Sequence, residues 1–248
     1  MEAAQVKGLL GLLLADGSLV QYSTPAGGYV QLTLTGGFHD SAYLEEKVEE
    51  FRQFIPTKAQ IVPYKSLGGV SSRPNAQGVL TREPKSTLVL RFRVSTNKLL
   101  PIYNLLYPQG ERRITRQVID MLGASAAAWV WAEGARTPTE GDARFDGTTI
   151  LARVGTSDNE AMLIAGWLEM LTGASSTLID DVRWKKPRLL FDPRQSAKAK
   201  KALLPYAPPS RIHRFKLTDD TATDQDSPEL VPGQGDHEPA GHQAEALA

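Results

Sequence analysis

The stretch Gly8-Leu-Leu-Gly-Leu-Leu-Leu-Ala-Asp-Gly17 decides the fold of this 248-residue chain, because it recurs in altered form as Ser125-Ala-Ala-Ala-Trp-Val-Trp-Ala-Glu-Gly134. Each copy predicts a helix, over residues 6–15 and 125–132, that an acid followed by glycine brings to an end. Counting back one, five and eight residues from the acids gives only small residues: Ala15, Gly11 and Gly8, and Ala132, Ala128 and Ser125. Such spacings share one helix face, so we predict that the two helices pack closely on each other.

The acids Asp16 and Glu133 are not explained by helix packing. We expect the large residues of both helices, including Trp129 and Trp131, to cover the flanks against their own halves of the chain. A carboxylate in the last turn of a helix is unfavourable beside the negative end of the helix dipole, so a cation should offset it. If the helices pack in parallel, the two acids emerge together as a carboxylate pair. Such a pair suits Mg²⁺ and phosphodiester hydrolysis.

Alternating strands and amphipathic helices follow the first acid. Residues 29–35 alternate, a helix is predicted over 41–54, a strand over 59–64, a second alternating strand over 86–95 and a helix over 97–107. In the second alternating strand we expect Leu88, Leu90, Phe92 and Val94 to face inward, with Arg91 and Arg93 on the outer face. The insert at 66–85 is too long for a simple turn, which favours either a loop that follows a ligand or a disordered segment.

The second half repeats this order in shorter form. It predicts a strand over 148–154, a helix over 158–171, strands near 176–183 and 187–191, and a final helix over 195–204. The order of elements therefore indicates two similar units in one chain.

Several segments of the chain resemble those of a known family. Residues 8–17 resemble the helix motif of the LAGLIDADG homing endonucleases, and residues 125–134 resemble the degenerate second motif of single-chain members, with Ala132-Glu133 in place of the usual Asp-Asp. The segment 100–114 resembles the family's linker into the second motif, and residues 204–208 and 215–217 resemble its closing segment. The resemblance covers roughly residues 5–218.

The resemblance implies an α+β fold of two pseudo-twofold-related αββαββα units, joined through paired motif helices, whose antiparallel sheets form a DNA-binding saddle. We expect the units at residues 1–115 and 116–218. Asp16 and Glu133 would bind Mg²⁺ or another divalent cation and cut double-stranded DNA at a long target. Arg112, and Lys216 as its symmetry mate, would be basic residues of the active site. The protein would act as a monomer.

Side chains on the outer sheet faces are candidates for DNA contacts, since phosphates and base edges are bound by Arg, Lys and small polar groups. The candidates in the two halves are Gln21, Ser23, Tyr29, Gln31, Thr33, Arg91 and Arg93, and then Arg153, Arg183, Lys185 and Arg188.

Charge is divided along the chain. All 28 basic residues and 20 of the 28 acidic ones lie in residues 1–218, which gives that part a net charge of +8 and favours a nucleic-acid partner. The remaining residues, 219–248, are acidic and poor in large apolar side chains, so we expect a disordered tail. The chain has no cysteine, and its first apolar stretch is far shorter than the ~20 residues of a membrane span. We expect a protein that is not secreted or membrane-bound, located in a cytoplasm or an organelle.

Two alternatives remain open. One is a relative that keeps the fold but has lost cleavage and acts as an intron RNA-splicing maturase or a DNA-binding regulator. Two features favour this alternative: Arg112 stands in place of the commoner lysine, and the second motif is altered. The other is a structural or interaction module, which leaves the acid pair unexplained. Intein splicing residues are absent from the sequence, which favours an intron-encoded or free-standing enzyme.

Overall fold

The computed structural model describes residues 3–25, 27–74, 80–137, 147–152, 154–181 and 186–217. Of residues 3–4, 66–74, 80–87 and 180–181 it describes the backbone only. The first half contains one helix, two strands, a helix, two strands and a helix in that order. Their bounds are α1 Ala3–Ala15, β1 Ser18–Thr24, β2 Gly27–Gly36, α2 Ser41–Phe54, β3 Ile61–Pro74, β4 Leu80–Thr96 and α3 Leu100–Leu106. Short 3-10 turns, η1 Phe38–Asp40 and η2 Asn97–Leu99, precede α2 and α3.

The second half repeats this order after a short helix, α4 Arg116–Asp120, which the sequence analysis did not predict. Its elements are α5 Ala124–Gly134, β5 Ala135–Arg136, β6 Thr149–Leu151, α6 Asp158–Thr172, β7 Thr177–Asp181, β8 Lys186–Phe191 and α7 Pro193–Leu203, followed by the 3-10 turns η4 Leu204–Tyr206 and η5 Pro209–Phe215. Each half contributes one four-stranded antiparallel sheet, with strand orders β1-β2-β4-β3 and β5-β6-β8-β7. The predicted pair of αββαββα units is confirmed.

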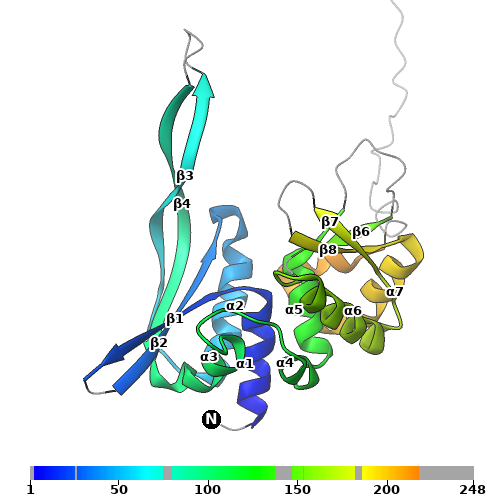
Figure 1. The fold of residues 1–248 in the computed structure, drawn as a ribbon, viewed down its shortest axis with the longest axis horizontal. Coiled ribbons are helices and arrows are strands. Elements are labelled where there is room, and N and C mark those ends of the chain that lie inside the picture. Colours follow the sequence, from blue (N-terminus) through cyan, green and yellow to red (C-terminus); the bar gives the residue numbers. More distant parts are fainter. Residues whose placement is uncertain are drawn as a thin grey trace, which may run out of the picture.

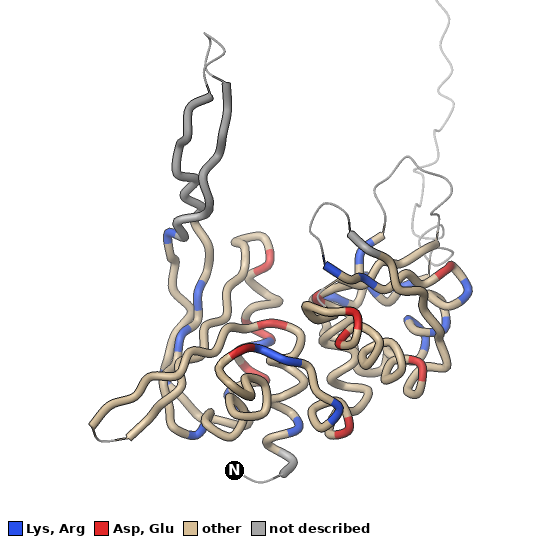
Figure 2. The backbone as a smooth tube through the Cα atoms, viewed as in Figure 1, with Lys and Arg blue, Asp and Glu red and all other residues tan. Residues whose placement is uncertain are grey.

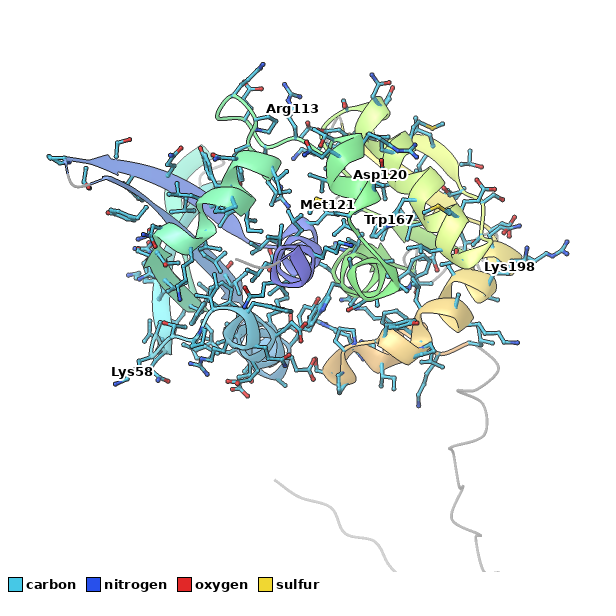
Figure 3. The ribbon with its side chains drawn as sticks, turned by 90° about the horizontal axis from the view of Figure 1, so that it is seen from below. Lys58, Arg113, Asp120, Met121, Trp167 and Lys198 are labelled. Atoms are coloured by element: carbon cyan, nitrogen blue, oxygen red, sulfur yellow. The ribbon has the colours of Figure 1, made fainter. Side chains whose placement is uncertain are left out.

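The two halves match in register as well as in order. An offset of 117 residues relates Asp16 to Glu133 and also relates Ser41, the first residue of α2, to Asp158, the first residue of α6. Helices α1 and α5 lie side by side in the centre, with the elements of the first half on one side and those of the second half on the other (Figures 1 and 3). This offset lets residues from α1 to α2 be compared one by one with residues from α5 to α6.

Close packing between α1 and α5 depends on Gly11. A Cβ built on Gly11 would lie 2.6 Å from the Cβ of Ala126, so the two backbones approach too closely for any side chain there. The predicted contact through small residues is therefore present at Gly11, and Ala128 and Ala132 are fully buried. Gly8 and Ser125 were also predicted to face the other central helix, but they do not. A Cβ on Gly8 would clash with Phe54 of α2, and Ser125 is exposed.

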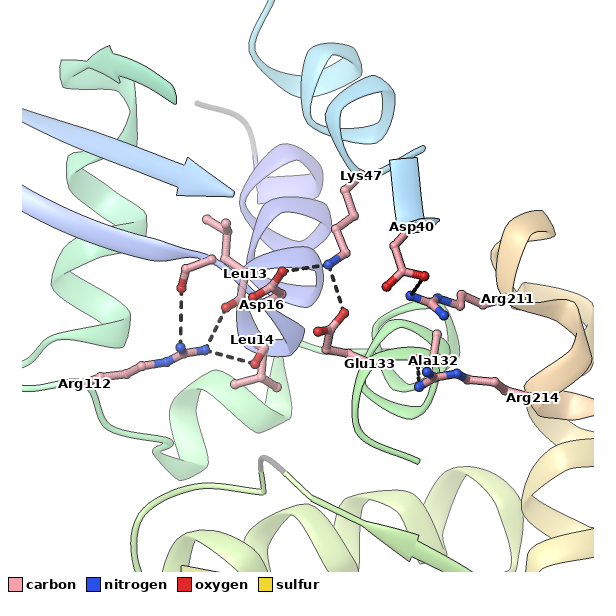
Figure 4. Close-up of polar contacts among 11 residues, drawn as sticks. Leu13, Leu14, Asp16, Asp40, Lys47, Arg112, Ala132, Glu133, Arg211 and Arg214 are labelled. Carbon is pink, nitrogen blue, oxygen red and sulfur yellow. Dashed lines mark hydrogen bonds and ion pairs between the residues drawn. The ribbon is translucent and has the colours of Figure 1, made fainter. Parts of the chain in front are cut away.

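The aromatic residues of α5 divide between the halves. Trp131 packs edge-on against Phe191 of its own half, with ring centroids 5.1 Å apart. Trp129 instead contacts Tyr43 of the first half at 5.8 Å, so the expectation that both tryptophans cover their own half was wrong for Trp129. Its ring is part of the interface because α2 lies beside the acid ends of both central helices, where Lys47 of α2 contacts Asp16 and Glu133 (Figure 4).

The glycines that follow the two acids serve different purposes. Gly17 has φ +110°, a backbone conformation that residues with side chains rarely adopt. Gly134 is still helical, but a Cβ there would lie 2.4 Å from the carbonyl oxygen of Ala152. The first glycine therefore permits a sharp turn into β1, and the second permits close approach of β6.

Each half is also held by a segment from the other half. The carboxylate of Glu160 on α6 accepts a hydrogen bond of 2.9 Å from the backbone N–H of Ile114 in the linker. In the first half, Glu46 on α2 accepts bonds of 2.8 and 2.7 Å from the backbone N–H and the hydroxyl of Ser210 in η5. These two reciprocal contacts fix the halves against each other.

The first sheet corrects two expectations about β3 and β4. Leu88 is 57% exposed, because it lies beyond the part of the sheet that the helices cover, whereas Phe92 is fully buried as predicted. The insert at 66–85 is mainly an extension of these strands, since their pairing continues past a bulge between Leu67 and Val70 as far as Pro74 and Leu80. The paired strands project from the body as a long hairpin (Figure 1). No helix in the described part of the chain is long and apolar enough to cross a membrane.

Candidate active site

Asp16 and Glu133 come together at the ends of α1 and α5, and a lysine lies between them (Figure 4). The Nζ atom of Lys47 is 2.6 Å from Oδ2 of Asp16 and 2.9 Å from Oε2 of Glu133. Lys47 is only 2% exposed, and the side chains of the two acids are 20% and 14% exposed. One ammonium group thus bridges carboxylates that are 117 residues apart in the sequence.

Sequence reasoning missed Lys47, although the sequence contains a signal for it. The residue lies on the apolar stripe of α2, between Leu44 and Phe51, at helical spacings that otherwise carry core side chains. A lysine in a buried stripe needs a charged partner, because an unpaired ammonium in the interior is very unfavourable. That requirement could have predicted an acid pair beside α2.

A second group of charged residues surrounds Tyr43 on the same side of the acid pair. The ring of Tyr43 lies 4.2 Å from Nζ of Lys47 and 4.4 Å from the guanidinium carbon of Arg211, both measured to its centroid. Arg211 also pairs with Asp40 at 2.9 Å. Burial, and then the negative charge of Glu133, raise the pKa of the Tyr43 hydroxyl well above its usual value, so this phenol stays protonated.

Arg112 binds the C-terminal end of α1. Its guanidinium donates to the carbonyl oxygens of Leu13 at 2.8 Å and Leu14 at 3.0 Å. In the second half Arg214 does the same for α5, with bonds of 2.7 Å to the carbonyl of Ala132 and 3.3 Å to that of Ala135. Both arginines offset the negative helix ends beside the two acids.

Arg214 thus binds the end of α5 as Arg112 binds the end of α1, and the pairing of Lys216 with Arg112 across the two halves stays a prediction. Lys216 lies just past η5 and is exposed, whereas Arg214 lies against the helix end (Figure 4). Burial, and then the charge of Arg211, lower the pKa of Arg214. The sequence pointed to Lys216 because the short turn η5, which sets which side chains point inward, was not predicted. A catalytic role for Lys216 stays a prediction.

Two cavities adjoin the acid pair, one lined by Asp16 and the other by Glu133. The larger one, of about 590 Å³, contains Asp16 together with cations of the linker and the second sheet, namely Arg112, Arg136, Lys186 and Arg188. The smaller one, of about 50 Å³, lies beside Glu133 and is lined by the charged and aromatic group already described, including Tyr43, Lys47 and Arg211. The acid pair thus has a spacious cationic side and a filled side.

The ligand types of this site fit an oxygen-preferring divalent cation. Mg²⁺ is commonly held by one or two carboxylates, with water and substrate phosphates as its other ligands. Asp16 and Glu133 are such a pair, and among the described residues no group of three or more His, Cys, Asp or Glu side chains gathers at one point. Lys47 already supplies a positive charge at the same place.

The outer face of the first sheet carries five of the seven candidate residues of that half. Tyr29, Gln31 and Thr33 alternate with the buried residues of β2, and Arg91 and Arg93 alternate with buried Phe92 in β4. Gln31 donates to the hydroxyl of Ser95 at 3.1 Å, and the guanidinium of Arg91 stacks on the ring of Tyr64 at 3.6 Å. In the part of the chain with described side chains, Lys and Arg follow these strands and those of the second sheet (Figure 2).

Gln21 and Ser23 lie on the opposite face, which corrects their assignment to the same surface. Gln21 pairs with Val30, and its strand neighbour Leu19 is buried, so this set of β1 residues faces the helices. The residues that replace them on the outer face are Val20 and Tyr22, which are 45% and 40% exposed. The sequence did not reveal this, because β1 extends beyond the helices and its inner face remains polar.

The second sheet contributes Arg188 to its outer face, as expected. Arg136 and Lys186, which the sequence analysis did not single out, lie nearby and line the larger cavity with it. Arg153, Arg183 and Lys185 lie outside the described residues.

No model of a known protein family matches the chain, and no curated protein matches it either. Solved structures do. The chain is similar to the homing endonuclease I-WcaI bound to its DNA recognition sequence, with a TM-score of 0.63, 12% identity and coverage of 87% of each chain. It is also similar to I-DmoI in complex with DNA and Mn, with a TM-score of 0.50, 15% identity and coverage of 82% of this chain and 97% of that one.

A further likeness is to mesophilic variants of I-DmoI, with a TM-score of 0.50, 16% identity and coverage of 85% of this chain and 96% of that one. At these identities the comparisons establish the fold. The protein has the fold of the LAGLIDADG homing endonucleases, which confirms the resemblance seen in the sequence.

Proposed function

We propose that this protein is a site-specific DNA endonuclease that hydrolyses phosphodiesters with Mg²⁺ or a similar cation. The observation that carries the proposal is the meeting of Asp16 and Glu133, one from each half, on a single ammonium group. Two sheets with cationic outer faces flank this point, and these cations would attract the phosphates of a duplex on both sides of the acids. Both acids come from one chain, so we propose that the monomer is the active form.

In this proposal the sheets hold the duplex and the acids meet its backbone. The outer-face residues Gln31, Thr33 and Arg93 would contact bases and phosphates in the first half, and Arg188 would do so in the second. Arg112 keeps α1 in place by binding its terminal carbonyls, which fixes Asp16. A divalent cation bound by Asp16 and Glu133 would supply charge neutralisation at the phosphate and an activated water.

A second candidate is a nucleic-acid-binding relative without cleavage, acting on DNA or on intron RNA. The observation that favours it is the Lys47 bridge, because an ammonium group already neutralises much of the charge that would attract a metal. The cavity beside Asp16 favours cleavage, since its volume of about 590 Å³ leaves room for a phosphodiester and a hydrated cation next to a carboxylate.

Selection from a randomised duplex library would test the two candidates. Duplexes retained by the full chain in Ca²⁺ would be sequenced, cloned into a supercoiled plasmid and incubated with the protein and Mg²⁺. Site-specific linear or nicked product supports the endonuclease. Tight, sequence-dependent binding with intact plasmid at all Mg²⁺ concentrations would instead assign the protein to the binding class.

A further inference from the structure

The two cavities beside the acid pair occupy equivalent places in the two halves. The offset of 117 residues relates Thr35 and Tyr43, which line the smaller cavity, to Ala152 and Glu160, which line the larger one. The same offset relates the acids themselves, since Glu133 lines the smaller cavity and Asp16 the larger. At these three positions the linings of the two cavities correspond, although the cavities measure about 50 and 590 Å³.

Lys47 accounts for much of this difference. Its side chain is buried at 2% exposure and reaches from α2 to both acids, filling the Glu133 side. Tyr43 and Arg211 pack around it, with Arg211 held by Asp40. At the corresponding position of α6 the chain has Ile164, which is 1% exposed and carries no charge. The cation is thus a feature of one half only.

Size and charge then give the two sides different capacities. The smaller cavity has less than a tenth of the volume of the larger one, and the Lys47 side chain lines it. A phosphodiester with a hydrated cation cannot enter unless the Lys47 ammonium leaves its two carboxylates. The larger cavity has room for both, and Arg112, Arg136 and Lys186 along its wall would attract the phosphate.

We propose that Lys47 is a resident cation that closes the Glu133 side, so that the two DNA strands are cut in a fixed order, beginning on the Asp16 side. The proposal rests on the proposed endonuclease function. Each cut consumes one water, whose oxygen forms a new bond to phosphorus while one ester P–O bond breaks and the leaving oxygen takes a proton. The second cut has to wait for Lys47 to be displaced.

Strand order gives the first test. A target duplex carrying different fluorophores on its two strands would be cut by the full chain with Mg²⁺, and both initial rates would be measured. We expect one strand to be cut about tenfold or more faster, a difference of about 1.4 kcal/mol between the two barriers. Lys47→Met should shrink the ratio severalfold, and the matched control Ile164→Met should leave it unchanged. Equal rates in the wild type, or an unchanged ratio in Lys47→Met, would overturn the proposal.

Thermal melting without DNA gives a second test that does not depend on cleavage. Removing Lys47 leaves two carboxylates facing each other, so Lys47→Met should bind Mg²⁺ or Mn²⁺ and its melting temperature should rise by roughly 2–4 °C or more with the metal. The wild type and Ile164→Met should respond much less. If the wild type never cuts DNA, the endonuclease proposal fails, and this melting response alone still decides the role of Lys47. A Lys47→Met protein that folds only with metal supports it, and one that melts alike with and without metal refutes it.

Discussion

Arg112 and Arg214 each bind carbonyl oxygens at the end of a central helix, Arg112 at α1 and Arg214 at α5. Arg112 comes from the linker that leaves the first half, and Arg214 comes from η5 at the end of the second. Since both helices end in a carboxylate, each arginine offsets the unfavourable charge at its helix end. The acids can therefore meet at one point without unravelling the turns that carry them.

Replacing either arginine should destabilise the protein. Arg112→Ala leaves the carbonyls of Leu13 and Leu14 without this donor, and Arg214→Ala does the same at Ala132, so we expect each to cost about 1–3 kcal/mol of unfolding free energy. Urea denaturation would measure this loss of unfolding free energy. Arg113→Ala is the control, because Arg113 is exposed and pairs only with nearby Glu111; a loss as large as that of Arg112→Ala would refute the capping role.

Neutralising the acids should remove cleavage and spare binding. Asp16→Asn and Glu133→Gln keep side-chain size but lose the charge that would hold a divalent cation, so neither variant should linearise a plasmid carrying the target. Gel-shift affinity should stay within a few-fold of the wild type, because binding rests on the sheets. Asp120→Asn, at an exposed ion pair of α4, serves as control. Wild-type linearisation by either acid variant would exclude the two-acid mechanism.

The contact between the central helices makes Gly11 sensitive to a single methyl group. Gly11→Ala should destabilise the protein by about 1–3 kcal/mol despite the better helix propensity of alanine, since overpacking a close contact is unfavourable. Gly166→Ala in α6 is the matched control, because nothing lies within 4 Å of a Cβ there; it should stabilise the fold by roughly 0.5–1 kcal/mol. Chemical denaturation of both variants gives the comparison, and a stabilised Gly11→Ala would mean that the helices separate readily.

Replacing Arg91 and Arg93 with alanine should weaken the salt dependence of DNA affinity. Each phosphate contact that alanine removes should lower the slope of log affinity against log salt by about one unit. Fluorescence anisotropy at several salt concentrations would measure this, with Arg116→Ala on α4 as control. A changed base preference at constant slope would assign the two arginines to base reading, and unchanged binding would take this sheet out of the interface.

Glu160 should make folding sensitive to acid. Burial by itself would raise its pKa, but hydrogen bonds from Thr156 and from the backbone of Ile114 and Ser157 lower it overall. A lowered folded pKa contributes stability that is present above the unfolded value, near 4.3, and is lost as the pH falls through the folded value.

The carboxamide of Glu160→Gln cannot supply that charge. The variant should be less stable by about 1–3 kcal/mol at pH 7, and its deficit relative to the wild type should shrink as the pH is lowered below about 4. Urea denaturation across this range measures the difference, and a deficit that does not change with pH would contradict the role of the carboxylate.

The sequence by itself determined the architecture. Two helices with small faces, each ending in an acid, and most strands and helices after them were readable because apolar periodicity and helix ends are local properties. The strands β1 and β5 were expected only from the family resemblance. The range of α2 was predicted to the residue, at 41–54. Alternation alone predicted that Phe92 lies in the core and that Arg91 and Arg93 lie outside it.

Only the tertiary structure decided what surrounds the acids. Lys47, Arg211 and Arg214 reach the site from elements that are distant in sequence, and their directions depend on how α2 and η5 pack against the other half. Strand register also needed the structure, since a shift of one residue moves a side chain to the other face, as happened for Gln21 and Ser23. Local pattern fixes what each segment becomes, whereas contacts between segments far apart in the chain are set by packing that no local pattern encodes.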